Sequence, residues 1–181
     1  MKNEVGIGTI LISKPFIEDK RFEKTIILIV ELSSEGTVGF IINKKPTKPV
    51  DVIIENCPQL NIKAKYGGPV STNNLFFIHQ YPDLITNSQE IKKGVFWGGE
   101  LEDVLQKCQS GQISSDDILF FVGYTGWEKN QLEKEIEEGS WIIYNMDLHQ
   151  IKHDLDWSKL LVDINQEYEV WATAPSNFHL N

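Results

Sequence analysis

Residues 25–43 read TIILIVELSSEGTVGFIIN, two apolar runs separated by four small or polar residues. Ile, Val and Phe dominate both runs, which is typical of β-strands. We therefore predict strands over Thr25–Leu32 and Thr37–Asn43, joined as a hairpin through Ser33–Gly36. Because Ile26–Val30 is apolar without alternation, the first strand is expected to be covered on both faces.

The chain on either side of this hairpin adds more strands and several short helices. Further strands are predicted at Gly8–Ser13, Leu75–His79, Val95–Trp97, Ile118–Tyr124 and Trp141–Tyr144. Helices are predicted at Pro49–Asn56, over the stripe Leu101, Val104, Leu105 and Cys108 ending at Gly111, from Asn130 to Gly139, and near Asp147–Leu155 and Trp157–Asn165. Strands outnumber helices and the early strands form hairpins, so the expected fold class is α+β with an antiparallel or mixed sheet. No linker or repeat divides residues 1–181, which are expected to form a single domain.

Arginine is almost absent, since Arg21 is the only one in a chain with 17 basic and 26 acidic residues and a net charge of −9. Proteins read duplex DNA through arginine forks and phosphate neutralisation, and anionic membranes attract basic segments. We therefore expect no direct nucleic-acid binding and no membrane partner. The acidity is concentrated in residues 128–169, where 11 acidic and 4 basic side chains give a net charge of −7.

Apolar runs in the chain are short. The longest unbroken ones, Ile26–Val30 and Ile118–Val122, are far too short to span a bilayer. Val5–Ile12 follows Glu4 and lacks a small-residue cleavage site, which favours a strand over a signal peptide. A cytoplasmic location is expected.

Motifs for metal, cofactor or hydrolytic chemistry are missing from the sequence. Cys57 and Cys108 form no CxxC pair and are interpreted as small buried residues in a reducing compartment. His149 and His153 lie four residues apart, but Gln150 stands where a zincin has its glutamate. No GxSxG, P-loop or GxGxxG occurs. We predict no metal site, no cofactor and no catalytic residue.

The densest motif runs from Gly123 to Glu133 and reads GYTGWEKNQLE. Its two glycines predict a sharp turn at the end of a buried strand. Asn130 and Glu133 have the spacing of a capping box at the start of the next helix. Gln131 and Glu135 are expected to point away from the apolar edge of that helix, which leaves them available to a ligand or partner.

A second glycine motif, Gly67-Gly68-Pro69-Val70, follows Tyr66. Two glycines before a proline permit a close backbone approach with a fixed exit direction. The motif is interpreted first as a structural turn, with an anion-binding nest of backbone N–H groups as the alternative.

Taken together, these motifs resemble the YqgE/AlgH family of bacterial proteins over nearly the whole chain, from Gly8 to about Trp157. The resemblance rests on Gly8, Leu11, Ser13, Pro15, Phe22, Lys24, Thr25, Glu31, Gly36, Gly39, Asn43, Gly67-Gly68-Pro69-Val70, Leu75 to His79, and the block Gly123, Tyr124, Gly126, Trp127, Gln131, Leu132, Glu133, Glu135, Ile136 and Trp141. Two departures stand out. Leu32 replaces the usual histidine and Lys44-Lys45-Pro46 replaces Arg-Pro, which puts in doubt any ligand role of those positions.

The resemblance implies a compact α+β domain whose bifurcated sheet curls into a pseudo-barrel with short flanking helices. Family members are often labelled transcriptional regulators, yet the resemblance implies no helix-turn-helix and brings no established reaction.

Two hypotheses about function remain open. The first is a cytoplasmic regulator that binds a protein partner or a small ligand, without direct DNA readout, through Asn43, Gly67, Gly68, Tyr124, Trp127, Gln131 and Glu135. The second is a hydrolase or transferase with an acid–base pocket of Glu31, Asn43, His79 and Glu135. An enzyme needs titratable groups that converge within hydrogen-bond reach, whereas a binding protein needs an exposed groove or patch. The oligomeric state is not predicted.

Overall fold

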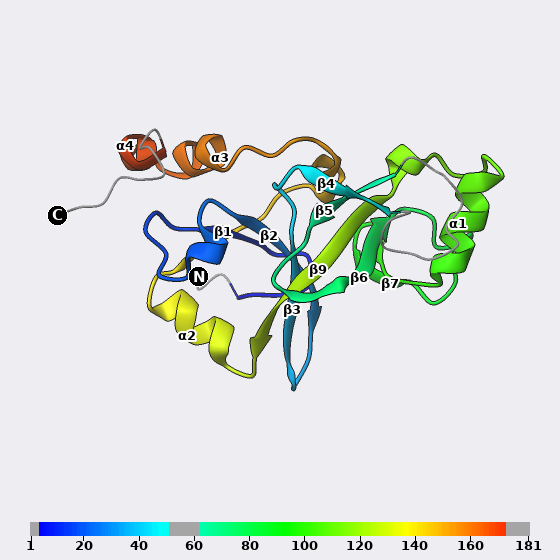
Figure 1. Ribbon diagram of the computed structural model, residues 1–181. Coiled ribbons are helices and arrows are strands. Elements are labelled where there is room, and N and C mark those ends of the chain that lie inside the picture. The colour runs from blue at the N-terminus through cyan, green and yellow to red at the C-terminus, as the bar shows by residue number, and fades with distance from the viewer. Residues whose placement is uncertain (1–3, 51–61, 173–181) are drawn as a thin grey trace.

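The computed structural model describes residues 4–50 and 62–172, and within them one ten-stranded sheet carries short helices (Figure 1). The strands are β1 Ile10–Ser13, β2 Ile26–Leu32, β3 Gly36–Ile41, β4 Pro46–Pro49, β5 Lys63–Tyr66, β6 Val70–His79, β7 Gln89–Lys92, β8 Val95–Trp97, β9 Leu119–Glu128 and β10 Trp141–Tyr144. The α-helices are α1 Leu101–Gln109, α2 Gln131–Glu137, α3 Trp157–Ile164 and α4 Glu169–Ala172, and the 3₁₀ turns are η1 Lys20–Phe22, η3 Ser115–Asp117, η4 Leu148–Lys152 and η5 Gln166–Tyr168. The α+β class is confirmed.

The strands follow the order β10-β1-β2-β3-β9-β6-β8-β7, with β4 and β5 branching from β9. One side of β9 pairs with β6, while its other side pairs first with β5, in parallel, and then with β3. The sheet therefore splits at β9, the long green strand that crosses the centre of Figure 1. The sheet is not closed, so the pseudo-barrel is not confirmed: within the described ranges β10 and β7 each pair with a single strand.

The hairpin predicted over Thr25–Asn43 forms, with β2 and β3 antiparallel. Residues Ile26 to Val30 are all buried. Ile26, Leu28 and Val30 belong to one apolar cluster and Ile27 with Ile29 to another, because successive side chains point to opposite faces of a strand. This confirms that β2 is covered on both faces.

Helices cover each face. Trp157 and Leu161 of α3 join the cluster that contains Ile26, while Leu132 of α2 joins the cluster that contains Ile27. In Figure 1, α2 and the α3–α4 pair lie on opposite sides of the β1–β2–β3 end, and α1 lies at the far end beside β6 and β7. None of the helices in residues 4–50 and 62–172 is long and apolar enough to cross a membrane.

The glycine motif in β9 does not make the sharp turn that its sequence predicts. The strand continues through Gly123 and Gly126 to Glu128. Gly123 has a φ of 71°, and a Cβ there would lie 2.4 Å from the carbonyl oxygen of Gly68. A Cβ on Gly67 would lie 2.3 Å from the carbonyl oxygen of Gly123. The glycines of both motifs therefore let two backbones approach each other closely, which a turn prediction from one motif alone misses.

Several helix and strand predictions differ from the structure. Pro49 ends β4, and most of the helix predicted at Pro49–Asn56 lies outside the described residues, as does Cys57. The helix predicted at Asp147–Leu155 is the 3₁₀ turn η4. The polar strands β4, β5 and β7 were not predicted, because strands such as β7, QEIK, have a single buried side chain and no apolar run.

Candidate functional site

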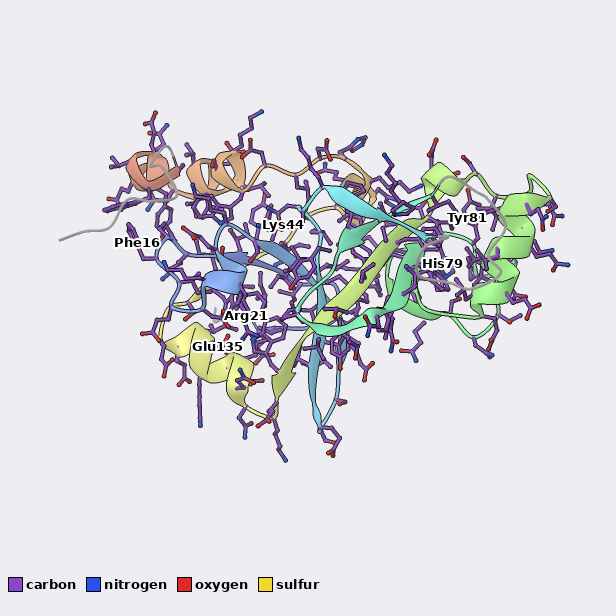
Figure 2. The ribbon with its side chains drawn as sticks, in the orientation of Figure 1. Phe16, Arg21, Lys44, His79, Tyr81 and Glu135 are labelled. Carbon is purple, nitrogen blue, oxygen red and sulfur yellow. The ribbon has the colours of Figure 1, made fainter. Side chains whose placement is uncertain are left out.

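A surface groove of about 300 Å³ lies between η1, the β5–β6 connection, the end of β9 and α2. We call it the α2 groove. Figure 2 shows Arg21 on η1 and Glu135 on α2 beside one another at this place. The groove is lined by Ile17, Glu18, Asp19, Arg21, Phe22, Pro69, Val70, Gly126, Trp127, Gln131, Glu135, Glu138, Ser140 and Trp141. Three of the predicted binding residues, Trp127, Gln131 and Glu135, therefore share one groove.

Glu135 organises one wall of the groove. Its Oε2 accepts hydrogen bonds from the indole N–H of Trp127 at 2.9 Å and from that of Trp141 at 2.7 Å. Its Oε1 accepts a bond from the side-chain amide of Gln131 at 2.9 Å. Both indoles are almost fully buried, with 5% of Trp127 and 3% of Trp141 exposed. Carboxylate bonds of this kind are charge-assisted, and they fix both rings.

The network corrects the expectation that Gln131 and Glu135 have no structural duty. Glu135 links α2 to β9 and β10 through the two indoles. The side-chain carbonyl of Gln131 also accepts a bond from the backbone N–H of Glu128 at 2.9 Å, which ties the end of β9 to the start of α2.

The capping box predicted at Asn130 and Glu133 is wrong. Asn130 adopts a left-handed conformation with a φ of 62° and makes no side-chain cap. Its side chain cannot reach the N–H groups of the first turn from that backbone conformation, because a capping residue normally has extended dihedrals. At the start of α2 the side-chain carbonyl of Gln131 accepts a hydrogen bond from the backbone N–H of Glu128 instead.

The opposite wall is η1, which carries the only arginine. Nε of Arg21 donates to Asp19 at 3.0 Å and Nη2 donates at 2.6 Å, a two-point contact. Arg21 thereby lowers the pKa of the Asp19 carboxyl, and Asp19 raises the pKa of the guanidinium. The guanidinium carbon also lies 5.7 Å from the centroid of the Phe22 ring. Because the pair is largely exposed, it adds little to stability.

The other predicted binding residues lie elsewhere. Asn43 bridges two strand ends, accepting from the N–H of Ile26 at 2.9 Å and donating to the carbonyl of Lys24 at 3.0 Å. Gly67 donates its N–H to Val122 and Gly68 is buried against Tyr124. The Tyr124 ring packs edge-on against Phe76, outside the groove.

The four residues of the enzyme hypothesis do not converge. Glu135, His79 and Asn43 line three different cavities, and Figure 2 shows His79 at the opposite end of the molecule from Glu135. Glu31 lies near the hairpin end of β2, opposite Val38, whereas Asn43 binds Ile26 at the other end.

His79 is a hydrogen-bonded structural residue. Its Nδ1 accepts the N–H of Tyr81 at 3.1 Å, so its Nε2 donates to the carbonyl of Gly98 at 3.2 Å in the neutral ring. Burial lowers its pKa. Both ring nitrogens are thereby engaged with backbone, which leaves neither free for proton transfer. Across residues 4–50 and 62–172, no three His, Cys, Asp or Glu side chains group in a way that could hold a metal ion.

Sequence reasoning missed Asp19, Arg21 and Phe22 as groove residues. The available signal is a single arginine among lysines, and the sequence alone does not connect that residue to α2. Trp141 was placed correctly in a strand, yet its link to Glu135 could not be read from helical spacing.

Comparisons with known proteins agree on one family. The family model described as AlgH-like matches residues 10–171. A UPF0301 protein of Cytophaga hutchinsonii is 33% identical over 178 residues, covering 96% of this chain and 98% of that protein. A UPF0301 protein of Chlorobaculum tepidum is 32% identical, covering 97% of each.

Two solved structures share the fold. The solution structure of the AlgH protein from Pseudomonas aeruginosa has a TM-score of 0.70 at 24% identity, covering 97% of this chain and 99% of that one. A crystal structure of a Corynebacterium diphtheriae protein has a TM-score of 0.75 at 21% identity, covering 96% and 95%.

Proposed function

The chain belongs to the AlgH-like family, as the resemblance read from its motifs predicted, and from that premise we propose that it is a binding protein whose working surface is the α2 groove. It acts by taking up a protein partner or a small ligand there, in a regulatory role, and it does not read DNA directly.

A single observation supports this proposal. The carboxylate of Glu135 holds two indoles and one amide in fixed positions beside an open groove. Groups that are already ordered lose little conformational entropy on binding, and the two indoles, 5% and 3% exposed, form a rigid backing for the more exposed residues of the groove. The neighbouring Val70 is 38% exposed and adds apolar area to the rim.

The enzyme hypothesis receives no comparable support, because its four residues are dispersed over separate cavities. We retain two further proposals from the sequence, a single-domain chain and a cytoplasmic setting.

The test is affinity capture from native lysate with the full chain immobilised, followed by mass spectrometry of proteins and metabolites. Val70→Lys places a long charged side chain on the groove rim. Val170→Lys makes the same change at a valine of α4 that is 69% exposed and lies outside the groove lining. We expect at least one species that the wild type and Val170→Lys retain and Val70→Lys loses. If no captured species responds to Val70→Lys, the α2 groove is not the working surface.

A further inference from the structure

The lining of the α2 groove has an excess of negative charge. Four carboxylates, those of Glu18, Asp19, Glu135 and Glu138, face a single cation, Arg21. Arg21 pairs with Asp19, and no lysine or arginine in the described parts of the chain forms an ion pair with the other three. The groove therefore has a net charge of −3 from its lining, and two of its four carboxylates, those of Glu135 and Glu138, belong to the acidic stretch 128–169.

Aromatic rings lie beside these carboxylates. The rings of Phe22 and Trp141 meet edge to face with centroids 5.8 Å apart, and those of Trp127 and Trp141 meet in the same way at 5.9 Å. Aromatic faces attract cations. Guanidinium groups are found over such faces more often than other cations, because they are planar and weakly hydrated.

The wall of the groove already holds one guanidinium in this manner. Arg21 makes its two-point contact with Asp19 and lies over the ring of Phe22. A carboxylate and an adjoining aromatic ring thus already bind a guanidinium group of the chain itself. Glu18 and Glu138 are exposed carboxylates of the same groove, and no cation of the described chain pairs with them.

The surroundings favour a peptide over a free small cation. Pro69 and Val70 offer apolar contact along the groove, suited to the aliphatic stem of a long basic side chain. Val70 begins β6, and the next four residues, Ser71–Asn74, are exposed and have no register partner on β9. An extended segment that left the groove would meet this stretch of backbone.

From these observations we infer that the α2 groove binds an arginine side chain presented by a basic segment of a partner protein, an inference that rests on the proposed binding function and names its ligand. The arginine lies between the carboxylates of Glu18 and Glu138 with its stem on the apolar rim. The half-buried ring of Phe22 lies beside it, backed by the buried indoles that Glu135 fixes.

The test uses NMR titration of the full chain, read at the indole N–H signals of Trp127 and Trp141. The probes are the capped peptide Gly-Arg-Gly-Arg-Gly, the same peptide with citrulline for arginine, which keeps the shape without the charge, and spermine. We expect the arginine peptide to shift both signals and to bind at least about tenfold more tightly than the citrulline peptide, because citrulline lacks the positive charge that the groove carboxylates attract. The signals of Trp97 and Trp171, outside the groove lining, should stay in place.

Two double variants supply the matched control. Glu18→Gln with Glu138→Gln removes two groove charges and leaves Glu135 intact, and we expect it to weaken the arginine peptide by about tenfold. Glu102→Gln with Glu167→Gln removes two exposed charges elsewhere and should bind like the wild type.

Three results would overturn the inference: equal binding of the arginine and citrulline peptides, unchanged binding by the groove variant, or binding of spermine without the arginine peptide. The proposed function stands or fails separately. If Val70→Lys abolishes capture of a species from lysate while the arginine peptide does not bind, the groove binds something else and only the ligand class is wrong.

Discussion

Replacing Glu135 with alanine should destabilise the protein, although Glu135 is a half-exposed helix residue. The change removes the acceptor of two indole N–H groups on residues that are 5% and 3% exposed, together with the partner of the Gln131 amide. A buried donor left without a partner costs about 1–3 kcal/mol. Since the groove admits water to this wall, we take the lower part of that range for each indole and expect a total loss of about 2–3 kcal/mol.

Urea unfolding followed by tryptophan emission measures this loss, and in a chain of this length it corresponds to a fall in melting temperature of about 4–12 °C. Glu138→Ala is the control, because Glu138 is exposed on the next turn and makes no side-chain hydrogen bond within the described residues. That variant should stay within about 0.5 kcal/mol of the wild type. If the two variants are equally stable, Glu135 does not hold the indoles and the rigid wall of the α2 groove is not real.

Three further predictions concern other parts of the molecule. Asn130→Gly should be more stable than Asn130→Ala by about 1 kcal/mol in urea melts, because only glycine adopts the φ of 62° without strain; equal stabilities would contradict the left-handed conformation. Burial holds the pKa of His79 below its ordinary value, so the unfolded chain takes up a proton that the folded one resists, and the free energy of unfolding should fall as pH drops below about 6.5. His79→Gln should flatten this slope between about pH 7.5 and about pH 5.5, and a slope parallel to that of the wild type would contradict the role of His79. The isolated protein should give no mobility shift with duplex DNA at physiological salt, given its net charge of −9; a shift that survives excess competitor DNA would refute this.

Prediction from sequence succeeded where one strand carried its own signal. The unbroken run Ile26–Val30 predicted a strand buried on both faces, and the structure places alternate residues in two clusters. Prediction failed where the conformation of one segment depends on its contact with a segment far away in the sequence. The local pattern around Gly123 predicts a turn, whereas the glycine is needed because the backbone of Gly68 lies against it, and no local pattern contains that information.

The residues of the candidate site could be predicted, or were missed, for the same reason. Trp127, Gln131 and Glu135 were predicted together because they lie in one motif. Arg21 and Phe22 reach the groove from a segment more than 100 positions earlier in the chain. Helical spacing could not reveal that Glu135 accepts hydrogen bonds from two indoles, one on β9 and one on β10. Asn130 was misassigned because its residue type suits both an N-cap and a left-handed turn.

The central position of β9 has a consequence for how the chain matures on the ribosome. The β2–β3 hairpin can close as soon as residue 41 emerges, but the register partners of the other side of β3 are residues 125–128 of β9. At a synthesis rate of about 5–20 residues per second, the intervening stretch takes roughly 4–17 s to be made. Throughout that interval a nascent hairpin whose first strand contains the unbroken apolar run Ile26–Val30 exposes an unpaired edge on β3, and unpaired edges invite association between chains. This edge of the hairpin is therefore open to other chains during synthesis, whereas in the finished sheet β9 covers it.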